Sequence, residues 1–131
     1  MKLLLDTHVW IWALQSPDRI DGAVRRQLEN PKNQIYLSPV SIWEAQHLHK
    51  RGRLRTKQSF SDWLDNALTA GPLHEAVFNF AVAAEAAGIT LPQSDPGDVF
   101  LAATASVLGL TVVTADPQLL ACGWLKTLAC E

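Results

Sequence analysis

Short apolar runs alternate along the chain with stretches in which apolar residues recur at helical spacing. Residues 1–5 (with three consecutive leucines), 35–37 and 110–114 are typical of strands buried in a covered parallel sheet. Further strands are expected at 73–77 and, as a terminal edge strand, at 124–128. Because helical stretches separate these runs, the pattern predicts an α/β fold with right-handed crossovers and a central parallel sheet.

Capping residues and prolines mark where the helices begin. Ser16-Pro17, Ser38-Pro39 and Asp95-Pro96 each combine a capping side chain with a proline at the first helical position. The expected helices cover, approximately, residues 7–14, 17–29, 39–51, 59–70, 81–88, 96–108 and 117–120.

Composition bounds the class of protein. With 131 residues, 48% hydrophobic residues and a formal net charge of −2, the chain is expected to be one soluble domain, residues 1–131, without general affinity for polyanions. Cys122 and Cys130 make no disulfide framework, which favours a reducing cytoplasm. The first apolar run is too short for a signal peptide, and residues 99–115 are too polar for a membrane span.

Acidic residues follow the expected strands. Asp6 and Asp116 each come directly after a buried strand, and the carboxyl ends of parallel strands share one edge of the sheet. Asp98 lies in the first turn of the helix that Asp95 is expected to cap. Each aspartate has an alternative explanation as an ordinary helix cap or first-turn acid.

One glutamate is harder to explain. The helix expected at 39–51 carries a stripe of residues on one face, namely Val40, Trp43, Glu44, His47 and Leu48. A carboxylate within such a stripe is expected to be protonated, paired or bound to a metal, because an unpaired buried charge is costly. The alternative is an outward-facing Glu44 that pairs with His47 or Lys50.

Four converging carboxylates, Asp6, Glu44, Asp98 and Asp116, would repel one another without a matching set of basic residues. Mg²⁺ or Mn²⁺ would relieve that repulsion, because hard cations prefer oxygen ligands. The chain contains neither GxxxxGK[ST] nor GxGxxG. An acidic metal site without a phosphate-binding loop points to phosphodiester hydrolysis rather than nucleotide-driven transfer.

A concentrated basic run follows the third expected helix. It contains Lys50, Arg51, Arg53, Arg55 and Lys57. Basic residues suit a helix C-terminus, and a solvated charged face is the ordinary explanation of such a run. The alternative is a contact with an RNA backbone or a partner protein.

Four segments, in this order, resemble signatures of the PIN-domain ribonucleases, and among them the VapC-type toxins of bacterial toxin–antitoxin pairs. They are LDTHVWIW (5–12), LSPVSIWE (37–44), DPGD with LAATA (95–98 and 101–105) and VTAD (113–116). The resemblance covers almost the whole chain. It implies a three-layer α/β/α sandwich and a Mg²⁺- or Mn²⁺-dependent endoribonuclease, the toxin of a type II pair. It also implies an RNA substrate, a cognate antitoxin and a homodimer.

The same resemblance implies roles for individual residues. Asp6, Glu44, Asp98 and Asp116 would form the catalytic acidic quartet. Asp6 and Asp98 would hold the principal metal with Asp116 close by, and Glu44 would ligate a second metal or orient the attacking water. Thr7, Asp95 and Thr114 would lie behind these acids and orient them.

The chain departs from the family pattern at two places. Relatives often carry a histidine where this chain has Gln93-Ser94, and an arginine where it has Val99. The missing arginine would remove a phosphate or partner contact. Two rival functions are an inactive PIN-fold binding module and a Mg²⁺-dependent phospho-acceptor domain. The latter needs an aspartate after a middle strand, where this chain has Tyr36-Leu37-Ser38.

Overall fold

The computed structural model describes residues 1–92 and 95–131, so the departure at Gln93-Ser94 lies outside the described residues. The strands are β1 (Lys2–Leu5), β2 (Gln34–Leu37), β3 (His74–Glu75), β4 (Thr111–Thr114) and β5 (Thr127–Ala129). They form a parallel sheet in the order β3-β2-β1-β4-β5, with β1 in the middle. The prediction of an α/β fold with a central parallel sheet is confirmed.

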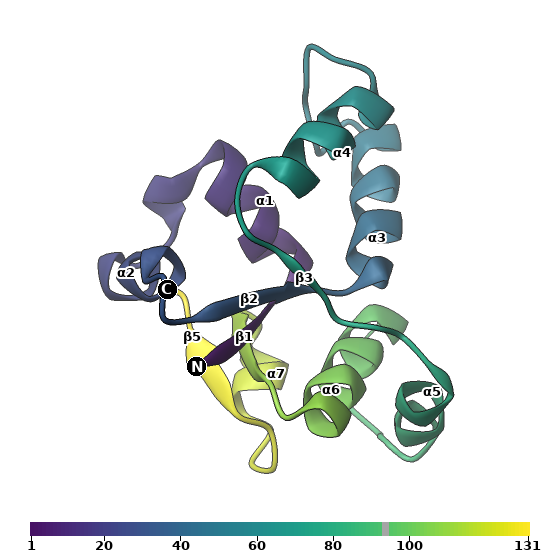
Figure 1. Cartoon of the computed structure of the whole chain (residues 1–131). Coiled ribbons are helices and arrows are strands. Elements are labelled where there is room, and N and C mark those ends of the chain that lie inside the picture. The colour runs from purple at the N-terminus through teal and green to yellow at the C-terminus, as the bar shows by residue number, and fades with distance from the viewer. Residues whose placement is uncertain (93–94) are drawn as a thin grey trace.

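The helices are α1 (Thr7–Gln15), α2 (Gly22–Glu29), α3 (Pro39–Lys50), α4 (Phe60–Thr69), α5 (Phe80–Ala87), α6 (Pro96–Leu108) and α7 (Pro117–Leu120). They cover both faces of the sheet, with α1 and α3 on one side and α6 on the other (Figure 1). The three-layer α/β/α arrangement therefore agrees with the expectation. Among the described residues, no helix is long and apolar enough to cross a membrane.

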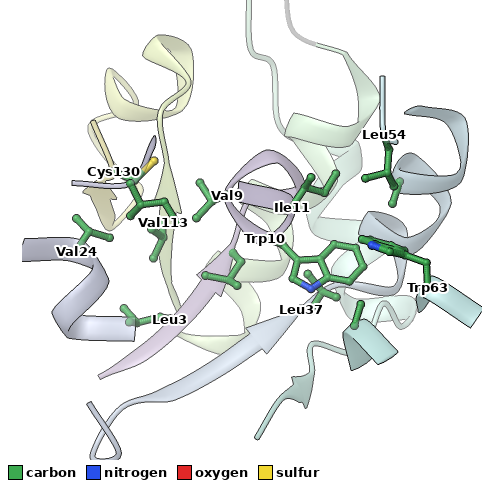
Figure 2. Packing of buried hydrophobic residues seen from close by; sticks show 14 residues of the cluster. Leu3, Val9, Trp10, Ile11, Val24, Leu37, Leu54, Trp63, Val113 and Cys130 are labelled. Carbon is green, nitrogen blue, oxygen red and sulfur yellow. The ribbon is translucent and has the colours of Figure 1, made fainter. Parts of the chain in front are cut away.

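Alternation along β1 divides the core between the two faces. Leu3 and Leu5 pack with α1 and its neighbours, whereas Leu4 packs with α6 and α7. These three side chains are at most 4% exposed. On the first face, Trp10 of α1 and Trp63 of α4 lie with ring centroids 5.4 Å apart (Figure 2). Because β1 is buried on both faces, the next residue, Asp6, is fixed at the carboxyl end of the central strand.

One expected helix is broken in the structure. The sequence predicted a single helix over 17–29, but a 3₁₀ turn at Pro17–Arg19 is separated from α2 by an extended Ile20. The side chain of Ile20 is 3% exposed and belongs to the core. The Asp21 carboxylate then accepts a hydrogen bond from the Ala23 amide and caps α2. The helix that begins after Ser16 therefore stops after one turn, because Ile20 is buried in the core and Asp21 caps a new helix.

Both edge strands are shorter than expected. The terminal strand is parallel to β4, but it begins at Thr127 rather than 124, and Trp124 lies in a turn with 53% of its surface exposed. Strand β3 contains two residues instead of the five expected. Cys122 and Cys130 are both free, as expected.

Candidate active site

The two strand-end aspartates cap the helices that follow them. Asp6 Oδ1 accepts a hydrogen bond of 3.2 Å from the His8 amide, and Asp116 Oδ1 accepts one of 2.8 Å from the Gln118 amide. The capping explanation is therefore geometrically correct for both residues. It accounts for one oxygen of each carboxylate and does not explain the position of the other.

Thr114 connects these two acids. Its buried hydroxyl donates a 2.7 Å hydrogen bond to Asp6 Oδ2 and accepts one of 3.0 Å from the Asp116 amide. Because Thr114 ends β4 and Asp6 follows the adjacent β1, register between two parallel strands brings Asp6 and Asp116 to one edge.

Asp98 lies opposite them in the first turn of α6. Asp95 caps this helix by accepting a 3.1 Å hydrogen bond from the Asp98 amide. The pKa of the Asp98 carboxyl rises to about 7, first because burial penalises its charge and then because Asp95, Asp116 and Asp6 repel it. A hydrogen bond with Asp116 favours the protonated form as well. A capping role alone does not explain a carboxyl surrounded by three others.

Glu44 is held by a buried pair of hydroxyls. Thr7 Oγ1 donates a 2.7 Å hydrogen bond to Glu44 Oε1 and lies 2.8 Å from Ser41 Oγ. Burial raises the pKa of the Glu44 carboxyl, the Thr7 hydrogen bond lowers it, and repulsion from Asp95 and Asp6 raises it further. Glu44 is thus bonded to Thr7, whereas the alternative of an outward-facing glutamate had named His47 or Lys50.

The environment expected for Glu44 was partly wrong. The buried positions of α3 are Ser41 and Ala45, whereas Trp43 is 59% exposed. The stripe through Trp43 and His47 borders an open groove instead of the core. It is the small residues of α3, not its largest aromatic, that let the helix approach its neighbours closely.

Sequence reasoning missed three residues that shape this site. A Cβ atom on Gly97 would collide with Glu44 Oε2, so any larger residue here would require the Glu44 carboxylate to move. Ser41, which is 1% exposed, backs Thr7. His8 places Nδ1 4.0 Å from Asp6 Oδ1. The available signals were the position of Gly97 between two acids and of Ser41 one helical turn before Glu44.

The acids described above line one cavity of about 310 Å³. Its walls contain five carboxylates, from Asp6, Glu44, Asp95, Asp98 and Asp116. No lysine or arginine is among its described lining residues. The quartet expected from the sequence therefore lies around one pocket, with Asp95 as a fifth acid. Of the basic run, Arg51 and Arg53 line an adjoining groove, and Lys50, Arg55 and Lys57 line neither cavity.

The donor set fits a hard divalent cation in its chemistry. It offers carboxylate oxygens, and the repulsion that raises the pKa of Asp98 is what a bound cation would relieve. Within the described residues, no three Asp, Glu, His or Cys side chains already have the spacing to hold one ion. Ligation by three carboxylates would therefore require them to draw together.

Comparison with known proteins places this chain in a family. Residues 3–124 match the family model of the PIN domain. The chain belongs to the PIN domain family. The family resemblance stated from the sequence is thus confirmed over most of the chain.

Individual relatives are distant. This PIN domain is 27% identical over 120 residues to "Ribonuclease VapC22" of Mycobacterium tuberculosis (strain ATCC 25618 / H37Rv), covering 89% of this chain and 88% of that protein. Its fold is similar to a chain of VapBC2 from Rickettsia felis bound to a promoter DNA fragment, with a TM-score of 0.72, 16% identity and full coverage of both chains. It also resembles a chain of VapBC-1 from nontypeable Haemophilus influenzae, with a TM-score of 0.66, 15% identity and coverage of 98% and 97%.

Proposed function

We propose that this PIN domain is a divalent-metal-dependent endoribonuclease acting as the toxin of a type II toxin–antitoxin pair in the cytoplasm. The single observation that carries the proposal is the pocket in which Asp6, Glu44, Asp98 and Asp116 meet without a basic counterpart among the described lining residues. Membership of the PIN domain family and the ribonuclease name of its 27% identical relative support it.

Each acid has a role that its surroundings support. Asp6 and Asp98 would hold the principal ion, Mg²⁺ or Mn²⁺, with Asp116 beside them. A bound cation would supply charge stabilisation at the scissile phosphate and activation of water. Glu44 would ligate a second ion or orient the attacking water, and the hydrogen bond from Thr7 restrains its carboxylate. Thr114 restrains Asp6 in the same way.

The proposal is tested by cleavage of a labelled single-stranded RNA. Asp6→Asn and Asp98→Asn should each lower the rate about 100-fold or more, because an amide replaces an anionic ligand. EDTA should stop cleavage by wild type, and Mg²⁺ or Mn²⁺ should restore it. Asp18→Asn is the matched control, because that carboxylate is 99% exposed and does not line the pocket. Undiminished cleavage in EDTA would contradict the metal-dependent mechanism.

The proposed partners are a cognate antitoxin and a second copy of the chain. A carboxylate pocket is a natural receptor for an arginine or lysine from an inhibitor, and such a side chain would compete with metal. Antitoxin affinity should therefore fall as the Mg²⁺ concentration rises and change in Asp98→Asn. An affinity indifferent to both would place inhibition elsewhere on the surface. Sedimentation of the purified chain tests the homodimer.

The rival proposal, an inactive binding module, is favoured by the spacing of the acids, which do not yet form a three-ligand group in the described part of the chain. Calorimetric titration with Mn²⁺ separates the two proposals. Binding that is lost in Asp98→Asn supports the enzyme, whereas no binding to wild type supports the module.

A further inference from the structure

An open groove of about 450 Å³ adjoins the acid pocket. Five residues line both cavities, namely Thr7, His8, Glu44, Asp95 and Gly97. The groove runs between α3 and the start of α6. These two helices contact each other near the acids, where Gly97 approaches Glu44. A chain seated in the pocket would therefore continue along α3.

The groove exposes a large aromatic surface. Trp43 is 59% exposed, whereas Trp10 and Trp63 in the core are 3% and 6% exposed. The Trp43 ring lies 4.0 Å from that of His47, one helical turn further along α3. The exposed indole of Trp43 offers a large apolar face on which a planar group can stack.

Positive charge follows the aromatic pair along the same helix. Arg51, four residues after His47, caps the C-terminus of α3, so the line from Trp43 to Arg51 spans about 12 Å of helix. Arg53 also lines the groove. Among the described residues, neither arginine has an acidic partner, since the ion pairs found there involve His8 with Asp6 and Arg25 with Asp18.

The loop that carries these arginines is fixed to the helix. Gly52 adopts a positive φ of 72°, which turns the chain back, and the amides of Arg53 and Leu54 both bond the Leu48 carbonyl at 2.8 and 3.2 Å. The Leu54 side chain is 2% exposed and anchors the turn in the core. The arginine backbones are thereby held beside the groove before any ligand binds.

We propose that the groove binds single-stranded RNA leading away from the acid pocket, with a nucleobase stacked on Trp43 and the following phosphates on Arg51 and Arg53. This rests on the proposed ribonuclease function and names the part of the substrate that lies outside the pocket. Aromatic faces interleaved with cations are how proteins hold unpaired nucleotides, and a duplex cannot offer a base face. The acids at one end and the arginines at the other fix where the phosphate backbone leaves the pocket.

The test measures binding of a short labelled RNA by fluorescence anisotropy, in an Asp98→Asn background that prevents cleavage. Trp43→Leu should weaken binding about 5- to 150-fold, the worth of one stacked base, and Trp43→Phe should restore most of it. Trp124→Leu is the matched control: this tryptophan is 53% exposed but lines a different pocket. The same RNA annealed to its complement should bind wild type and Trp43→Leu equally.

The arginines provide an independent readout. Arg53→Gln should flatten the plot of log affinity against log salt by about 0.7 per lost phosphate contact, and Arg55→Gln, outside the groove, should not. In otherwise wild-type protein, Trp43→Leu should raise KM more than it lowers kcat.

The outcomes separate this inference from the function on which it rests. Efficient cleavage with unchanged RNA affinity in Trp43→Leu overturns the groove and leaves the ribonuclease standing. Trp43-dependent RNA binding without cleavage in any divalent metal preserves the groove and refutes the enzyme. If Trp43→Leu instead disrupts a dimer or an antitoxin complex and leaves RNA affinity intact, the groove is a protein interface and the inference is wrong.

Discussion

The two sides of the acid pocket are held together by different kinds of contact. On the strand side, Asp6 and Asp116 follow adjacent strands and are bonded to Thr114 and to the first amides of their own helices. On the helix side, Glu44 and Asp98 come from α3 and α6, are partly buried, and have raised pKa values. The strand side is thus well supplied with hydrogen-bond donors, whereas on the helix side burial, and then repulsion from neighbouring carboxylates, disfavours the charged forms. A bound cation would favour those charged forms.

Of the substitutions that test this difference between the two sides of the pocket, Gly97→Ala should have the largest effect. The added methyl group would displace the Glu44 carboxylate, so cleavage should fall about 100-fold, as expected for a displacement of about 1 Å. Gly22→Ala is the matched control, a first-turn glycine of α2 whose added Cβ meets nothing closer than 3.7 Å. The Gly22→Ala variant should keep its activity, and its free energy of unfolding should rise by about 0.5 kcal/mol. Normal cleavage by Gly97→Ala would show that Glu44 need not stay where it is.

Removing the threonine hydroxyl on either side of the pocket should lower the stability of the protein, and the loss should be larger on the strand side. Thr114→Val removes a donor to Asp6 and an acceptor for the Asp116 amide, and should lower the free energy of unfolding by about 2–3 kcal/mol. Thr7→Val removes a donor to Glu44 and a neighbour of Ser41, at a cost of about 1.5–2 kcal/mol.

Urea unfolding of the metal-free protein measures both changes. Thr104→Val is the control, because within the described residues this buried hydroxyl bonds the Phe100 carbonyl of its own helix and no other group. Equal losses for Thr104→Val and Thr7→Val would mean that the contact with Glu44 contributes nothing beyond an ordinary intrahelical bond.

The helix side should make the stability of the protein depend on pH. The pKa of Asp98 is raised from 3.8 to about 7 in the folded protein, so between these values the folded state binds more protons than the unfolded state. Stability of the metal-free protein should therefore fall as pH rises from about 5 to 8, by about 1–2 kcal/mol once solvent screening of the half-exposed carboxyl is included. Asp98→Asn should flatten this decline, and an unchanged slope would contradict the assignment to Asp98.

The strand side could be predicted from the sequence because its determinants are local. An apolar run followed by an acid and a helix start specifies both the strand and the position of Asp6, and residues 111–116 repeat the pattern. Parallel pairing then brings the two acids to one edge without further information. The family resemblance supplied the roles of Thr7 and Thr114, which the observed hydrogen bonds support.

The helix side could not be derived in this way. The contact between Gly97 and Glu44 joins residues 53 positions apart, and the orientation of α3 depends on Ser41 and Ala45, which carry little sequence signal. The apolar stripe through Trp43 predicted burial where the structure has a groove. The break at Ile20 has a similar origin, because core packing decides between two helix starts of comparable strength.

The central claim is that Asp98 belongs to a metal-binding cluster and is more than a first-turn acid. Thermal melting of wild type and Asp98→Asn, with EDTA and with Mg²⁺, tests it without any substrate. Asp62→Asn is the matched control, because Asp62 is an exposed third residue of α4 whose amide is bonded by the capping Ser59, as Asp98 is by Asp95. It should lose about 0.3–1 kcal/mol in both conditions. We expect Asp98→Asn to melt above wild type in EDTA, where it relieves repulsion, and below it in Mg²⁺, where wild type gains about 2.7 kcal/mol at a hundredfold excess over Kd. If wild type melts above Asp98→Asn by the same margin in both conditions, the metal cluster is contradicted and Asp98 is only a first-turn acid.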